Sequence, residues 1–264
     1  MAVLIYIKRL IVFLLNKIGY DLAFSKIGRN SYTIVDTSIW EPFFLPDANR
    51  KRYLEGQIKS KNEVHDNFPK QLRFYSLYQL AEHVLKNKIP GHFAECGVWT
   101  GHSAYMLCSL MKENNFQDKL YIFDSFEGGL SEKNKKDANL RYNYDKEMNI
   151  SESEVFFSTE KQVRDCLKEF DFFNIYPGWI PSRFDEVKNL EFSFIHIDVD
   201  LYEPTLDSLK FFYPRLSRGG VIQCDDYGLS QFPGAKKAVD EFLSSDVKPT
   251  FFYKAPMGSC FIMK

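Results

Sequence analysis

Carboxylates follow two short apolar runs in the second half of the sequence. Asp198 and Asp200 come directly after one run, and Asp225 and Asp226 come directly after the next. If both runs are neighbouring strands of a parallel sheet, about 4.8 Å apart, the acids meet at one edge and raise each other's pKa. A hard divalent cation such as Mg²⁺ takes oxygen ligands and removes this repulsion. The pattern therefore predicts a metal site; the alternative is that these acids cap helices and meet Lys or Arg.

Two glycines and an acid follow an earlier apolar run. Gly97 and Gly101 have Gly-x-x-x-Gly spacing, which differs from the Gly-x-Gly-x-x-Gly of a dinucleotide site. Glycines let the backbone bend sharply and approach a ligand, and the helix expected next offers free N–H groups that suit a carboxylate. Glu95, just before the turn, suits an ammonium group. The pattern fits an amino-acid-bearing nucleoside; an ordinary strand–helix turn is the alternative.

A third acid, Asp124, ends another apolar run and is followed by Ser125. A carboxylate at the end of the second strand can accept hydrogen bonds from ribose hydroxyls. The alternative is a helix N-cap, since Asp and Ser are both good capping residues.

The elements that would position these residues are short apolar runs alternating with helical patterns from His92 onward. Such alternation predicts an α/β fold with a mostly parallel sheet and helices on both faces. Gly219-Gly220 is expected to cap a helix. The expected strands are 93–96, 120–123, 173–176, 192–197 and 221–224, with a closing hairpin of 250–253 and 260–263, and the expected helices are 103–112, 159–170, 205–216 and 235–243.

Residues 1–70 are expected to form a helical extension before a single domain over residues 71–264. Within the extension, Arg50 to Lys61 is a charged stretch that we expect to be solvated. Residues 71–86 then have the apolar spacing of a helix.

The N-terminus, Val3 to Ile18, is apolar but contains Lys8, Arg9 and Lys17. Its uncharged runs are too short to cross a bilayer, which needs about 20 apolar residues, and no cleavage site of a secretory signal follows. We expect a helix here to pack on the protein or on a second subunit, and we expect the protein to form a homo-oligomer. Alternatively, residues 1–20 would lie in an anionic membrane surface.

Composition narrows the class of protein. The 264 residues carry a formal net charge of -1, with 45% apolar and 26% charged residues, which is typical of a globular protein and gives no electrostatic reason to expect a nucleic-acid partner. The five cysteines include no Cys-x-x-Cys pair, so we expect small buried hydrophobes in a reducing cytosol. The expected location is cytoplasmic, with contact at the inner membrane face left open.

Together these motifs resemble a known family. The stretch from about Gln71 to Leu243 is similar to the macrocin and mycinamicin type of sugar O-methyltransferase. The resemblance is carried by Glu95-Cys96-Gly97-Val98-Trp99, Asp124-Ser125-Phe126-Glu127-Gly128, Gly178-Trp179, Asp198-Val199-Asp200-Leu201-Tyr202-Glu203, Gly219-Gly220 and Asp225-Asp226-Tyr227. The chain departs from the family pattern at Thr100-Gly101-His102, at Val199 and at Gly129-Leu130.

The resemblance implies a Rossmann-like class I methyltransferase fold with a seven-stranded sheet. It implies S-adenosylmethionine and Mg²⁺ as cofactors and a hydroxyl of a sugar or a glycan or natural-product precursor as the acceptor. Asp198, Asp225 and Asp226 would bind the metal, and Asp198 would also be the catalytic base. The cofactor would be held by Glu95, Gly97, Gly101, Ser103, Asp124, Ser125, Gly178 and Trp179.

Two other functions remain open at this point. Asp198-Val199-Asp200 matches the Asp-x-Asp of metal-dependent glycosyltransferases, but that function leaves Glu95 and Asp124 without a role. A non-catalytic, methyltransferase-like scaffold is the second alternative, and it leaves the concentrated acidic charge without a role.

Overall fold

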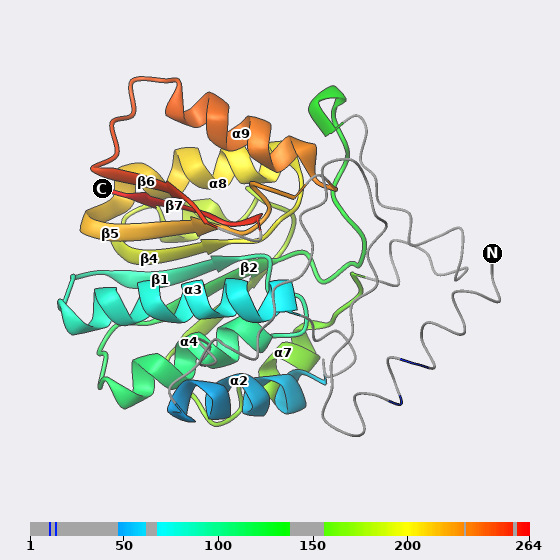
Figure 1. Ribbon diagram of the computed structural model, residues 1–264, viewed down its shortest axis with the longest axis vertical. Coiled ribbons are helices and arrows are strands. Elements are labelled where there is room, and N and C mark those ends of the chain that lie inside the picture. Colours follow the sequence, from blue (N-terminus) through cyan, green and yellow to red (C-terminus); the bar gives the residue numbers. More distant parts are fainter. Residues whose placement is uncertain are drawn as a thin grey trace. The chain divides into compact units, whose positions relative to one another are not determined.

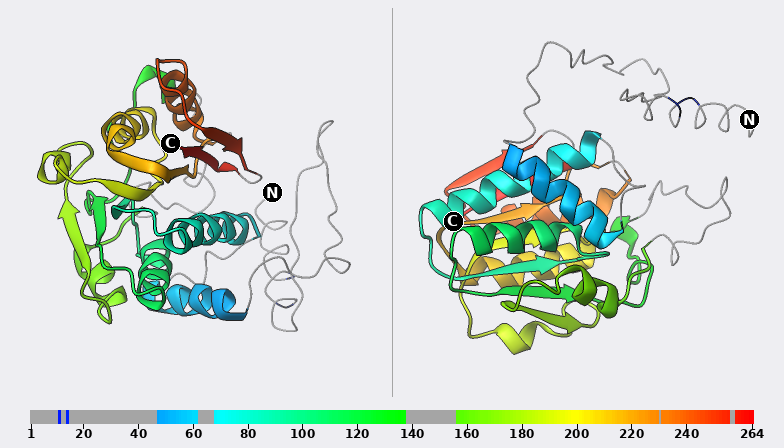
Figure 2. Two further views of the ribbon diagram at one scale, coloured as in Figure 1. Left: turned by 90° about the vertical axis from the view of Figure 1, so that its left-hand side faces the viewer. Right: turned by 90° about the horizontal axis from the view of Figure 1, so that it is seen from below.

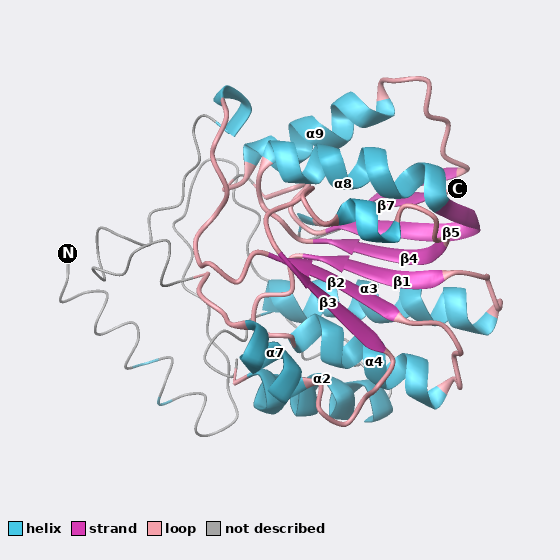
Figure 3. Ribbon diagram, turned by 180° about the vertical axis from the view of Figure 1, so that it is seen from behind, coloured by secondary structure: helices cyan, strands magenta, loops and turns pink. Residues whose placement is uncertain are grey.

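A seven-stranded sheet forms the centre of the computed structural model, in the order β3-β2-β1-β4-β5-β7-β6 (Figure 3). The first five strands pair in parallel, and β7 is antiparallel to both β5 and β6. The prediction of a mostly parallel α/β sheet is confirmed. The strands are β1 (His92–Cys96), β2 (Leu120–Asp124), β3 (Phe173–Pro177), β4 (Phe192–Ile197), β5 (Leu216–Cys224), β6 (Phe251–Lys254) and β7 (Cys260–Met263).

Chain order reverses between β1 and β4, because β2 and β3 lie on one side of β1 while β4 and β5 lie on the other. In open α/β sheets, ligands bind beyond the carboxyl ends of the strands at such a switch point. The carboxyl ends of β1 and β4 are therefore the place to look for a site.

Helices cover both faces of the sheet (Figures 1 and 2). One buried cluster includes residues of α3, α4 and α7, and the other includes residues of α8 and α9. All six residues of β4 are buried because both faces of this strand are covered. The helices are α2 (Asp47–Ser60), α3 (Phe68–Lys86), α4 (His102–Glu113), α7 (Glu160–Cys166), α8 (Tyr202–Arg215) and α9 (Pro233–Leu243), with short 3₁₀ turns η3 (Lys135–Asp137) and η4 (Phe184–Val187).

We expected the charged stretch from Arg50 to Lys61 to be solvated, but it lies mostly within α2. One side of this helix is buried, with Tyr53 only 3% exposed. His102, at the start of α4, places its ring Nε2 2.8 Å from the Tyr53 carbonyl oxygen. Lys51 and Lys59 of α2 are exposed, whereas Arg52 is mostly covered and pairs with Glu113 of α4. The many charged residues of this stretch made its buried side hard to recognise in the sequence.

Two boundary predictions were wrong. The helix expected over residues 159–170 ends at Cys166, although Thr159 does cap it through a capping box with Gln162. Gly219 and Gly220 do not cap α8. They lie within β5, where Gly219 has a φ of 82° and the register against β4 shifts. The helix α8 passes directly into β5 at Leu216, so these glycines do not end the helix. They lie where the register between β5 and β4 shifts.

The structure describes residues 11, 14, 47–61, 68–137, 156–229, 231–255 and 258–264. The chain divides into two compact units, Met1–Phe43 and Phe44–Lys264, and α2 and α3 lie in the same unit as the sheet. The helix expected over residues 3–18 lies outside the described residues, apart from the helical positions Ile11 and Leu14. No helix in the described ranges is long and apolar enough to cross a membrane. All five cysteines are free and buried, as expected.

Candidate active site

Loops that follow adjacent strands lie side by side at the carboxyl edge of the sheet. The backbone N–H groups of Gly97, Asp198 and Asp225 each donate to a carbonyl near the end of the neighbouring strand, at 2.8, 2.9 and 2.9 Å. This continued pairing brings the glycine loop and both acidic strand ends together at the switch point.

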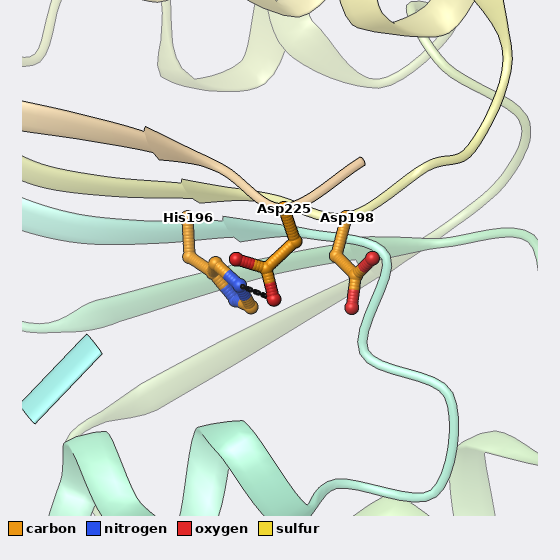
Figure 4. Close-up of side chains that lie close together, drawn as sticks. All are labelled: His196, Asp198 and Asp225. Atoms are coloured by element: carbon orange, nitrogen blue, oxygen red, sulfur yellow. Dashed lines mark ion pairs between the residues drawn. The ribbon is translucent and has the colours of Figure 1, made fainter. Parts of the chain in front are cut away.

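The acids form a compact cluster there. His196, Asp198 and Asp225 each offer one ligand atom, and these atoms lie within 4.8 Å of one another (Figure 4). Asp226 is buried, and its Oδ2 accepts the N–H of Asp200 at 3.0 Å. Neighbouring parallel strands therefore bring the acids together as the sequence predicts.

Burial and repulsion raise the pKa of two of these acids. For Asp198, burial is the larger cause and the charge of Asp225 adds to it. For Asp226, burial is again the larger cause, and the charges of Asp200 and Asp198 raise the pKa further. A bound cation would stabilise the ionised form of both side chains, so their electrostatics fit an oxygen-ligated divalent metal.

Asp225 differs because donors and cations surround its carboxylate. Oδ1 accepts hydrogen bonds from Gln223 Nε2 at 2.6 Å and from Ser259 Oγ at 2.9 Å. Oδ2 lies 3.3 Å from His196 Nε2 and 3.7 Å from Arg73 Nε. Although burial alone would raise the pKa of Asp225, the two cations hold it below its ordinary value. Asp225 is thus a fixed carboxylate even without a metal.

His196 connects Asp225 to Glu95. Its Nδ1 lies 2.8 Å from Oε1 of Glu95, and the two side chains are only 2% and 0% exposed. Glu95, His196 and Gln223 pair in one row across β1, β4 and β5. Burial would lower the pKa of His196, but the carboxylates of Asp225 and Glu95 raise it well above its ordinary value.

Sequence reasoning assigned no role to either cation of this cluster. His196 lies two residues before Asp198, so its side chain leaves the same face of β4 at the strand end. Arg73 lies on the stripe of α3 that contains the buried residues Leu77 and Ala81. The position of Arg73 on this apolar stripe is the feature of the sequence from which its burial could have been predicted.

The glycine loop has the sharp bend that was predicted. Gly97 has a φ of 81° and Gly101, the residue before α4, a φ of 94°. A β-carbon on Gly97 would lie 2.0 Å from the carbonyl oxygen of Asp198. The first glycine is therefore required by the approach of the β4 loop. Ser103 lies in the first turn of α4 and is half-buried.

Asp124 organises the loops that follow β1, β2 and β3. Its Oδ2 accepts the N–H groups of Val98 and Trp99 at 2.8 and 3.1 Å, and its Oδ1 accepts that of Phe126 at 3.0 Å. Its carbonyl accepts the N–H of Gly178 at 2.9 Å. This acid holds the glycine loop, a role that the sequence did not suggest.

Ser125 and Trp179 meet through a shared neighbour. Ser125 Oγ accepts the N–H of Glu127 at 3.3 Å, and Trp179 Nε1 donates to the Glu127 carboxylate at 2.8 Å. The loops after β2 and β3 are therefore joined, and the residues predicted to hold a cofactor lie mainly on the β1, β2 and β3 side of the switch point. The residues predicted to bind a metal lie on the β4 and β5 side.

The strand order and these strand ends define a class I methyltransferase fold. The solved structure of the O-methyltransferase NovP matches with a TM-score of 0.63 at 21% identity, covering 83% of this chain and 99% of that one. The calicheamicin methyltransferase CalS11 matches with a TM-score of 0.55 at 19% identity, covering 83% and 93%. At these identities the likeness concerns the fold alone.

Residues 63–249 match the model of the macrocin-O-methyltransferase (TylF) family, and the chain belongs to this family. Demethyldecarbamoylnovobiocin O-methyltransferase of Streptomyces niveus is 29% identical over 178 residues, which are 64% of each chain. A 4'-O-methyltransferase of Streptomyces olivaceus, which acts on a rhamnosyl-tetracenomycin, is 31% identical over 60% of each chain. The chain thus spans less than two thirds of the length of these two relatives.

Proposed function

We propose that this chain is an S-adenosylmethionine-dependent, metal-assisted O-methyltransferase acting on a hydroxyl of a sugar or a glycan or natural-product precursor. The observation that carries the proposal is the pair of Asp198 and Asp225, which with His196 offer ligand atoms within 4.8 Å of one another beside the glycine loop at the switch point. Asp226 lies next to Asp198, to which its side chain is hydrogen-bonded. Family membership supports the proposal, as do the names of relatives that methylate demethyldecarbamoylnovobiocin and a rhamnosyl-tetracenomycin.

The loops after β1, β2 and β3 would hold S-adenosylmethionine. Oε2 of Glu95 is buried and has no hydrogen-bond partner among the described residues, so it suits the methionine ammonium group. The cofactor's carboxylate would meet the free N–H groups at the start of α4, near Gly101 and Ser103. Asp124 would serve the ribose through Oδ1, since a carboxylate oxygen can accept more than one hydrogen bond.

Three further residues complete the proposed cofactor site. Gly97 would border the methionine moiety, in a loop whose bend its φ of 81° allows. Ser125 and Trp179 would border the nucleoside, since both contact Glu127 beside Asp124. Gly178 would close that side through its hydrogen bond to the Asp124 carbonyl.

Asp198, Asp225 and Asp226 would hold a divalent cation, Mg²⁺ being the natural choice for oxygen donors. Such a cation, when bound, lowers the pKa of a hydroxyl that it contacts. Asp225 would supply an already fixed oxygen. Burial and neighbouring carboxylates raise the pKa of Asp198 and of Asp226. A cation bound between them would offset both effects.

Asp198 would accept the proton of the acceptor hydroxyl. Its side chain is half-buried at the end of β4 and therefore reachable, and a carboxylate held next to the hydroxyl can take its proton as the new bond forms. Methyl transfer is an in-line displacement, in which the acceptor oxygen attacks the methyl carbon as the bond to sulfur breaks. The protein's contribution is to align the two reactants across the edge between β1 and β4.

Neither alternative accounts for the site as well. A glycosyltransferase would use Asp198 and Asp200 and would leave Glu95 and Asp225-Asp226 without a role, and the family is one of methyltransferases. A scaffold without activity would not need several carboxylates packed against one another at the ends of β4 and β5.

The test is methyl transfer by the purified full chain with S-adenosylmethionine, MgCl₂ and a panel of rhamnosides and nucleotide-linked hexoses. We expect formation of S-adenosylhomocysteine that requires both a sugar acceptor and a divalent cation. Asp198→Asn should lower the rate roughly 100-fold or more, while Asp185→Asn, an exposed acid of η4, should leave it unchanged. Full activity after exhaustive chelation would overturn the metal, and release of a nucleoside diphosphate from a nucleotide sugar in the absence of S-adenosylmethionine would favour the glycosyltransferase.

A further inference from the structure

A buried bridge of three side chains, Glu95, His196 and Asp225, crosses the sheet from β1 to the end of β5. The atom pairs that form it are Glu95 Oε1 with His196 Nδ1, at 2.8 Å, and His196 Nε2 with Asp225 Oδ2, at 3.3 Å. No side chain in this bridge is more than 5% exposed. Its two ends are a residue proposed for the cofactor and a residue proposed for the cation.

His196 contacts both ends. Glu95 belongs to the strand that leads into the glycine loop, and Asp225 belongs to the loop after β5, with β4 between them. The imidazole has one nitrogen for each carboxylate, so one ring orientation satisfies both. Rotation or loss of this ring would remove one contact from each carboxylate at the same time.

We propose that His196 is a positioning residue that sets the geometry of both binding sites, Nδ1 orienting Glu95 toward the cofactor and Nε2 orienting Asp225 toward the cation. The inference rests on the proposed function. Residues that orient metal ligands through a second hydrogen bond are known to matter, since their loss typically lowers metal affinity about 10–100-fold.

The two nitrogens can be tested separately because two amide side chains each mimic one of them. In His196→Asn the amide nitrogen takes the place of Nδ1 and keeps the bond to Glu95. In His196→Gln the amide nitrogen takes the place of Nε2 and keeps the contact with Asp225. Both variants replace the imidazole with an uncharged amide, so each is the matched control for the other.

We would measure the dissociation constants of both variants for Mn²⁺ by electron paramagnetic resonance and for S-adenosylhomocysteine by calorimetry without metal. We expect His196→Gln to bind Mn²⁺ at least about 10-fold more tightly than His196→Asn, and His196→Asn to bind S-adenosylhomocysteine more tightly than His196→Gln. A bridge that only stabilises the fold would lower the melting temperature of both variants and leave the two affinities in no such order. Equal affinities, or the reverse order, would overturn the proposal.

The wild type provides a second measurement if a variant does not fold. The ¹⁵N resonances of the His196 ring should shift when S-adenosylhomocysteine is added alone and when Mg²⁺ is added alone. His92, at the opposite end of β1, serves as the internal control and should not shift. A His196 ring that responds to only one ligand would contradict the bridge. Failure of the wild type to bind either ligand would instead contradict the proposed function.

Discussion

Gly97 lies so close to Asp198 that a β-carbon on the glycine would be 2.0 Å from the aspartate's carbonyl oxygen. The loop proposed for the cofactor and the loop proposed for the cation are therefore in backbone contact. A change on one side of this contact must displace the other, because neither backbone can yield independently.

Gly97→Ala should lower the free energy of unfolding by about 2–4 kcal/mol, since the left-handed φ and the backbone clash both oppose a β-carbon. Gly101→Ala is the control. Gly101 also has a positive φ, but its added β-carbon would have only ordinary contacts with Cys166, at 3.4 Å. We expect Gly101→Ala to lose about 1–2 kcal/mol from backbone strain alone. Urea denaturation would compare the two variants, and equal losses would show that the contact with Asp198 is not rigid.

Asp225→Asn and Asp226→Asn should change the stability of the metal-free protein in opposite directions. Asp225 is the partner of His196 and Arg73, so neutralising it leaves buried positive charge and should cost about 3–5 kcal/mol. Asp226 is repelled by Asp198 and Asp200, so its neutral isostere should gain about 1 kcal/mol. Melting temperatures in EDTA would measure both changes. A loss of stability in Asp226→Asn would contradict the assigned repulsion.

The stability of the metal-free protein should fall as pH rises through the range between the ordinary pKa of Asp226 and its raised value in the folded state. The folded protein binds this proton more tightly than the unfolded chain does, so the stabilisation is complete below the ordinary pKa, about 4, and is lost above the raised one. Asp226→Asn should remove this part of the pH dependence. Thermal unfolding of both proteins in EDTA from pH 4 upward would reveal it, and parallel curves would exclude it.

Glu95→Gln should weaken binding of S-adenosylhomocysteine by about 1.5–3 kcal/mol, the usual value of a hydrogen bond to a charged group. Glutamine keeps an oxygen that can accept from His196 Nδ1, so the bridge retains its hydrogen bond while the negative charge is lost. Calorimetry would give the affinity. Exposed Glu160→Gln, in the first turn of α7, is the control and should bind like the wild type. Unchanged binding by Glu95→Gln would mean that the ammonium group lies elsewhere.

The alternation of strands and helices could be predicted from the sequence, because apolar runs of strand length and amphipathic spacing are local properties. The acids and glycines at the strand ends could be recognised there as well. Since strands in a parallel sheet end at a common edge, Asp198 and Asp225 could be expected to meet before any coordinates were known.

Which positively charged side chains lie beside those acids depends on the tertiary structure. Arg73 is far from Asp225 along the chain, and His196 gains its partners only because β4 lies between β1 and β5. The burial of one face of α2 and the place of Gly219 within β5 likewise depend on α4 and β4, which are distant in sequence. Pairing across strands and helices is a non-local property, and local patterns contain no information about which side chain completes a buried contact.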